Sequence, residues 1–247
     1  MLAIQLKFDL LMFSREIFYL VFTLALPPLA YLFLGQLFSN QTYAGNLSYA
    51  QIYTPAFILL ITFTVIFFAF GFDQVSHRTT GVEKRIQLTP VSKNILLLSG
   101  IIRSLIITSF GFVLIYLIGI TVYGLDFGLV GFLRSYAVFI VINAALLLIA
   151  SAIYSFFTND KSALVFSIVI FQVVMLTGGF AMPVERMPKF VQTIADLNPL
   201  YHMNQIFTAV WNNQLNFGSD TFLSIGYIVL LSVLSFFILQ IKNKRKY

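Results

Sequence analysis

Six long apolar segments dominate this sequence and limit what it can fold into. They cover residues 17–38, 52–72, 95–122, 135–157, a stretch from the 158–161 turn to about 181, and 222–241. A helix of about 20 mostly apolar residues can cross a bilayer, because it satisfies its own backbone hydrogen bonds in hydrocarbon. A membrane barrel would alternate with period two, and these runs are continuous. The pattern therefore predicts an all-α integral membrane protein with six transmembrane helices, in a single domain over residues 1–247.

The composition agrees with a bilayer and argues against several other classes. Hydrophobic residues make up 59% of the chain and charged residues 10%, whereas a soluble domain carries about 25% charged residues. The net charge of +6 comes from bases between apolar segments, so we expect no nucleic-acid partner. With no Cys and only two His, disulfides and the usual zinc sites are excluded, and no metal site is expected.

Three regions outside the apolar cores have patterns of their own. Residues 3–16 mix apolar and polar side chains and predict an interfacial helix that leads into the membrane. Pro27 and Pro28 lie near the middle of the first span, where a kink is expected. Residues 182–220 predict two short amphipathic helices, separated at the Asn198-Pro199 pair, that lie at or dip into the outer interface as re-entrant elements.

The positions of Lys and Arg predict the orientation. Eleven bases fall on the side of the two termini, the 73–93 segment and the 158–161 turn, and three fall on the other side. The positive-inside rule therefore places both termini in the cytoplasm of a multi-pass cell-membrane protein. Arg103 lies about two turns into the third span, and we expect its side chain to snorkel to the cytoplasmic face.

The spans lack the groups that membrane catalysis or ion coupling requires. No predicted span interior holds Asp, Glu or His, which disfavours a hydrolase and an ion-driven carrier. The chain also has no G-x-x-x-x-G-K-[ST] loop for ATP, so any ATP energy must come from a partner. The segment 73–93 is the longest cytoplasmic one, and its centre, 81–88, predicts a short helix stopped by Pro90. It is either a handle for that partner or an ordinary solvated connector.

Two stretches resemble a known family. The run TGVEKRIQLTPVS over residues 80–92 is similar to the cytoplasmic signature of type-2 ABC exporter permeases, in which a glycine and a basic turn precede T-P-[LV]-S. Residues 178–201 add the family's small and aromatic run, its P-[LV]-E-x-[LM]-P turn and its N-P-L-x-[YH] element. The resemblance covers nearly the whole chain. One departure lies before the glycine, where His77, Thr79 and Thr80 replace the acidic residues of many members.

The resemblance implies two functional regions and a set of partners. Residues 79–92 would form a coupling helix held in a groove of a separate nucleotide-binding ATPase, and residues around 186–211 would cap the exit side. The implied coupling residues are Thr79, Thr80, Gly81, Glu83, Lys84, Arg85, Thr89, Pro90 and Ser92. The implied outer residues are Gly178, Gly179, Pro183, Glu185, Pro188, Asn198, Pro199, Tyr201 and His202. The working unit would have two permeases, alike or different, and two ATPases that bind ATP and Mg, while this chain binds no cofactor.

The predicted function is the export of a hydrophobic or amphipathic cargo such as a lipid, antibiotic or peptide. Spans one, two and five would line the pathway, and membrane lipid could occupy the same surface. Gly81 would allow close backbone approach, and Lys84 and Arg85 would meet acidic groups on the ATPase. His202 is expected to form interfacial hydrogen bonds. Two alternatives stay open, a stand-alone secondary carrier and a non-transporting membrane immunity or scaffold protein.

Overall fold

The computed structural model describes residues 2–38, 47–88, 93–180 and 182–244. Within these ranges every regular element is a helix, and six helices are long and apolar enough to cross a membrane. They run over Val21–Phe38, Tyr49–Thr79, Ile95–Tyr123, Leu129–Tyr154, Asp160–Thr177 and Ser219–Lys242. The predicted all-α architecture with six transmembrane helices is therefore confirmed.

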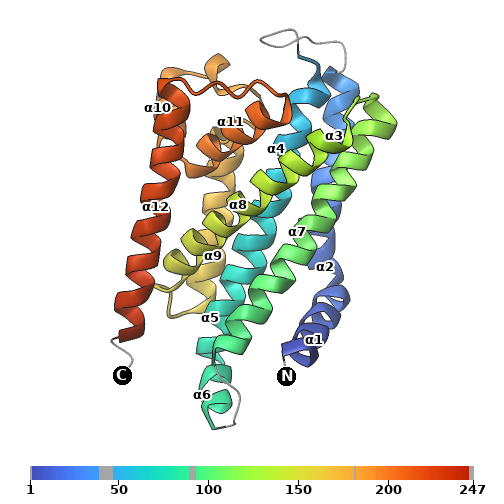
Figure 1. The fold of residues 1–247 in the computed structure, drawn as a ribbon. Helices are drawn as coiled ribbons and strands as arrows, with labels where there is room; N and C mark the ends of the chain where they lie inside the picture. The colour runs from blue at the N-terminus through green and yellow to red at the C-terminus, as the bar shows by residue number, and fades with distance from the viewer. Residues whose placement is uncertain (1, 39–46, 89–92, 181, 245–247) are drawn as a thin grey trace.

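The spans form a bundle whose two ends carry different short helices (Figure 1). At one end, near both chain termini, α6 (Val82–Gln87) projects beyond the spans. At the opposite end α10 (Lys189–Asp196) and α11 (Pro199–Trp211) precede the last span, α12 (Ser219–Lys244). The two short helices predicted for the stretch before the last span are present, and they separate at the Asn198-Pro199 pair as expected.

The first span accommodates its two prolines through a wider turn. After α2 (Ile17–Leu20), a π-helical turn over Val21–Ala25 leads into α3 (Leu26–Phe38), which contains Pro27 and Pro28. Pro27 has no N–H to bond the carbonyl of Thr23 four residues earlier. That carbonyl instead accepts a long bond of 3.5 Å from the Thr64 hydroxyl of the neighbouring span. The predicted disturbance of the helix therefore lies in the turn before the prolines.

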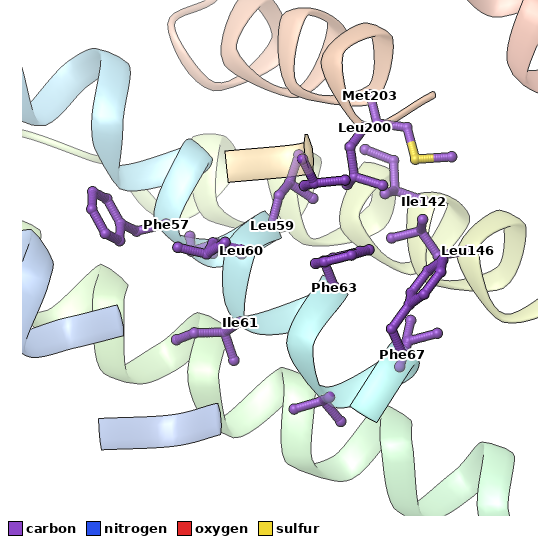
Figure 2. Packing of buried hydrophobic residues seen from close by; sticks show 14 of the residues in the cluster. Phe57, Leu59, Leu60, Ile61, Phe63, Phe67, Ile142, Leu146, Leu200 and Met203 are labelled. Atoms are coloured by element: carbon purple, nitrogen blue, oxygen red, sulfur yellow. The ribbon is translucent and has the colours of Figure 1, made fainter. Parts of the chain in front are cut away.

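The second span is the central helix of the bundle. It consists of α4 (Tyr49–Thr64), the π-helical η3 (Val65–Gly71) and α5 (Phe72–Thr79), which continue into one another with right-handed helical dihedrals. Of its most apolar stretch, 89% is buried by the rest of the chain. Figure 2 shows Phe63 and Phe67 beside residues of α8 (Leu129–Tyr154), with α11 residues above them.

Burial of the second span corrects one expectation about the pathway. A helix enclosed by its own chain cannot line a route on the outside of the bundle, so span two does not present the surface expected of it. The more exposed spans are the first, fifth and sixth. Of their most apolar stretches, 28%, 22% and 11% are buried by the rest of the chain. These three offer the faces for lipid or for another subunit.

Glycines permit close contacts within the bundle. A Cβ added at Gly71 would lie 2.4 Å from the Tyr154 ring of α8, and one at Gly111 would lie 2.6 Å from Ile61. Gly111 belongs to α7 (Lys93–Tyr123), the third span. Lipid tails are as apolar as Leu, so helices in a membrane associate through close packing and hydrogen bonds rather than exclusion from water. These small residues let the central helix approach its neighbours.

The N-terminal helix α1 (Leu2–Arg15) turns a polar residue toward the bundle. Asp9 is 6% exposed and accepts hydrogen bonds from Gln5 Nε2 at 2.8 Å and from Ser99 Oγ of α7 at 2.5 Å. Ile4 and Phe8 are exposed. The polar pattern read from residues 3–16 therefore serves helix packing as well as any contact with an interface.

Candidate functional site

The first candidate region is the bend that joins α5 to α6. Thr80 ends α5 with φ −79° and ψ −4°, and Gly81 follows with φ 74° and ψ 14°. The Thr80 amide donates to the Ser76 carbonyl at 2.9 Å, and the Arg85 amide donates to the Gly81 carbonyl at 3.1 Å. A left-handed residue after a helix is usually glycine, because a Cβ is disfavoured there. The bend thus redirects the chain within two residues.

Polar contacts fasten α5 to three other spans. Its Asp73 pairs with Arg103 of α7 at 2.5 Å, and its Gln74 donates to Ser151 of α8 at 3.0 Å. Arg78 Nη2 donates to the Tyr154 carbonyl of α8 at 2.6 Å. These contacts, spaced along one short helix, make α5 a rigid extension of the bundle.

A further contact lies at the last turn of α5. The Thr79 hydroxyl donates to Asp160 Oδ1 at 2.8 Å, and Asp160 is the first residue of α9 (Asp160–Thr177). The residue expected to be part of the ATPase contact therefore also joins the bend to the fifth span.

The Asp73–Arg103 pair corrects two expectations. Arg103 is 7% exposed, so it does not snorkel to the bilayer surface. Asp73 was expected to begin a connector, but the helix of span two continues through it to Thr79. An ionisable residue inside a membrane usually has a partner. The signal was present in the sequence, because opposite charges lie near the adjoining ends of consecutive spans.

The other predicted coupling residues occupy α6 and the segment after it. Thr89, Pro90 and Ser92 lie outside the described residues. Glu83 and Lys84 belong to the helical backbone of α6, and Arg85 is exposed.

The backbone conformation at Gly81 favours glycine within the chain itself. A Cβ at Gly81 would meet no atom of the described chain within 4 Å, so its positive φ, rather than close approach within the chain, favours glycine. The Thr80 hydroxyl donates to the Ser76 carbonyl at 2.6 Å and so reinforces the end of α5.

The second candidate region joins the end of α9 to the start of α11. Asn198 is the N-cap of α11, where its Oδ1 accepts from the Leu200 amide at 3.0 Å. Its Nδ2 donates to the Thr177 hydroxyl at 2.8 Å. Asn204 Nδ2 donates to the Gly178 carbonyl at 3.0 Å, beside the left-handed Gly179. Two amides thus tie the turn after the fifth span to the helix before the sixth.

Neighbouring ring residues are also held by hydrogen bonds. His202 Nε2 lies 2.8 Å from the Asp196 carbonyl and Nδ1 lies 2.9 Å from the Ser224 hydroxyl. A carbonyl only accepts, so the neutral ring carries its proton on Nε2. This matches the expected hydrogen-bonding role. Burial, followed by the charges of the Glu185 and Asp196 carboxylates, raises the pKa of Tyr201 to about 12.

Part of this outer region lines a cavity of about 530 Å³. Four predicted residues, Gly179, Pro183, Glu185 and Tyr201, line it together with Asn204. Gly178, Pro188, Asn198, Pro199 and His202 lie in the turns and helices around it. Asn204 was missed by sequence reasoning, because nothing in its local pattern distinguishes it. Among the described residues no cluster of three or more His, Cys, Asp and Glu side chains forms a metal site.

The fold and these two regions together define a class of protein. A bundle of six apolar spans, with a helical extension at one end and capped short helices at the other, is a polytopic membrane protein. A family model described as ABC-2 family transporter protein matches residues 35–240. This is most of the sequence, so the chain belongs to the ABC-2 family of transporter proteins.

Two curated relatives share this similarity. The chain is 22% identical over 178 residues to a protein named probable multidrug ABC transporter permease YbhR, from Escherichia coli strain K12 and from E. coli O157:H7. Each match covers 72% of this chain and 48% of the relative. The chain therefore spans about half the length of the curated relatives it matches.

Proposed function

We propose that this chain is the transmembrane permease subunit of an ATP-driven exporter whose energy comes from a separate ATPase. Its membership of a transporter family supports this function, as does the permease name of its curated relatives. The single observation that carries the proposal is the α5–α6 bend. It places a short helix that projects beyond the spans (Figure 1) at the end of a segment that is hydrogen-bonded to three other spans.

This geometry suits the transmission of force. When two ATPase subunits close on ATP and Mg, a pull on α6 would act on α5 through the two-residue bend. Because Asp73, Gln74 and Thr79 join α5 to α7, α8 and α9, the pull would move these spans as a body. Catalysis belongs to the ATPase in this scheme, and Arg85, with Lys84, meets its acidic groups.

The proposed assembly contains two ATPases and two permeases. Both termini and α6 face the cytoplasm, as the charge distribution predicts. The exposed faces of spans one, five and six would face membrane lipid or the second permease. The apolar spans suit a hydrophobic or amphipathic cargo, and the word multidrug in the relatives' name is consistent with such a cargo.

The proposed orientation can be tested directly because the chain contains no Cys. Leu88→Cys and Phe217→Cys place single thiols at exposed sites, 89% and 64% exposed, at opposite ends of the bundle. A membrane-impermeant maleimide should label Phe217→Cys in intact cells and Leu88→Cys only in inside-out vesicles. Labelling of Leu88→Cys in intact cells would contradict the proposal.

Partner binding separates the permease from its alternatives. Purification in mild detergent should retain an ATPase that is lost when residues 82–88 are replaced by a Gly-Ser linker of equal length. Reconstituted chain alone should show no flux driven by an ion gradient. Such flux would indicate a stand-alone carrier, and toxin binding without ATPase or flux would indicate an immunity protein.

A further inference from the structure

A second cavity, of about 520 Å³, lies at the α6 end of the bundle, beside the polar contacts that hold α5. Its walls come from α5, α7, α8 and α12. Figure 1 shows α8 running obliquely from the upper part of α7 toward the lower part of α12. The cavity therefore lies between spans of one chain.

The cavity holds its polar side chains at the end nearest α6, where Leu96, Leu97 and Leu239 also line it, and is apolar at the other end. Asp73, His77, Arg78 and Lys242 line the end nearest α6. Farther along the spans the lining is Ile101, Leu105, Ile140, Ala144 and Leu148. The polarity of a phospholipid changes in the same direction, from its charged headgroup to its acyl chains.

Arg103 lies between the two ends and has unused donors. Its Nη2 donates to Asp73, but its Nε is buried without a hydrogen-bond partner among the described residues. The guanidinium carries five N–H donors, and its fork matches the oxygens of a phosphate. Nε is enclosed by the protein, so an anion in the cavity would bind the guanidinium through its Nη donors.

The charges around the cavity favour an anion. Three cationic residues, Arg78, Arg103 and Lys242, line it with two carboxylates, Asp9 and Asp73. Both carboxylates already accept hydrogen bonds, Asp9 from Gln5 and Ser99, and Asp73 from Arg103. Arg78 and Lys242 donate to main-chain carbonyls, at 2.6 Å each.

The depth of the site agrees with a headgroup. The 29-residue span over Ile95–Tyr123 is about 43 Å long at 1.5 Å per residue, longer than a hydrocarbon core of about 30 Å. Its ends therefore reach the headgroup region. With the excess length divided equally between the two ends, Arg103, about 12 Å from Ile95 along the axis, lies about 5–6 Å inside the hydrocarbon edge.

We infer that this cavity binds one anionic phospholipid from the leaflet on the side of α6, with Arg103 holding the phosphate and the α7–α8 wall holding an acyl chain. The lipid would contact α5, the helix that carries α6. The inference requires only that the chain lies in a bilayer, so it stands or falls separately from the transport function.

The experiment compares two matched substitutions on one helix. Ala144→Trp fills the apolar part of the cavity, while Ala137→Trp adds the same side chain two turns away on the same face of α8, outside the cavity. Both alanines are exposed, so neither change should prevent folding. Delipidated full-length protein is titrated with phosphatidylglycerol or phosphatidylcholine, and bound lipid is counted by native mass spectrometry.

Wild type and Ala137→Trp should bind one phosphatidylglycerol in preference to phosphatidylcholine, and Ala144→Trp should weaken this binding about tenfold or more. Arg103→Lys, which keeps a charge for Asp73, should lose most of the preference because it lacks the fork. Equal binding by the two Trp variants, equal binding of both lipids, or displacement by millimolar inorganic phosphate would overturn the inference. The last result would indicate a site for free phosphate.

Discussion

The Asp73–Arg103 pair makes an asymmetric prediction about stability. The Arg103 side chain is 8% exposed, whereas that of Asp73 is 35% exposed. Asp73→Asn leaves a buried guanidinium without its counter-charge, and breaking a fully buried pair costs about 3–5 kcal/mol. Partial solvation of this pair lowers the expected cost to about 3 kcal/mol. Arg103→Met leaves a carboxylate that water can reach, so we expect about 1–2 kcal/mol.

A double-mutant cycle measures this asymmetry. Unfolding of wild type, both single variants and the double variant is followed by circular dichroism in mixed micelles with increasing denaturant. The coupling energy should be about 2 kcal/mol, since the two residues are in direct contact. Lys189→Met, at an exposed position, serves as the control and should change stability by less than about 0.5 kcal/mol. An Arg103→Met variant less stable than Asp73→Asn, or a coupling near zero, would refute the reasoning.

Three further predictions follow from local geometry. Gly81→Ala should cost about 1–2 kcal/mol at the bend and Gly81→Asn less, because only the left-handed φ opposes a side chain there. Stimulation of the ATPase by each variant is measured; it should fall in Gly81→Ala and not in Gly81→Asn, and an equal loss in both would contradict this cause. Asn198→Ser should keep the helix cap and lose the bond to Thr177, whereas Asn198→Ala should lose both and unfold at lower denaturant; equal midpoints would show that the cap contributes nothing. Because the pKa of Tyr201 is raised, its contribution to stability is fully present below pH 10 and declines as the pH rises from 10 toward 12. In thermal melts between pH 9 and 11.5, Tyr201→Phe should lose less stability than wild type, and an unchanged decline would exclude this phenol as its source.

The span positions were predictable because hydrophobic run length is a local property. The predicted third span, 95–122, and the observed Ile95–Tyr123 nearly coincide. The helical end of span two was not predictable in the same way, because Asp73 and His77 are polar and suggest a connector. The helix continues through them because residues of α7 and α8 form hydrogen bonds with polar side chains of α5.

The sequence located the two candidate regions, but it did not show which residues contact one another within them. Pro188 and the Asn198-Pro199 pair indicated the breaks between the outer helices, since a missing N–H and a capping amide act locally. The contact between Asn204 and the Gly178 carbonyl joins residues 26 apart in sequence, so only the folded chain brings them together. The same holds for Thr79 and Asp160, which are 81 residues apart.

By itself the sequence determined that this protein has six apolar helices, a short helix after the second span and two short helices before the last span, because each depends on residues close together along the chain. Only the tertiary structure decided that span two lies at the centre, that Arg103 pairs with Asp73, and that an amphipathic cavity opens between α7, α8 and α12. The physical reason is that lipid solvates every apolar helix face about equally. Hydropathy therefore shows which segments cross the membrane, while close packing and polar contacts decide how they are arranged.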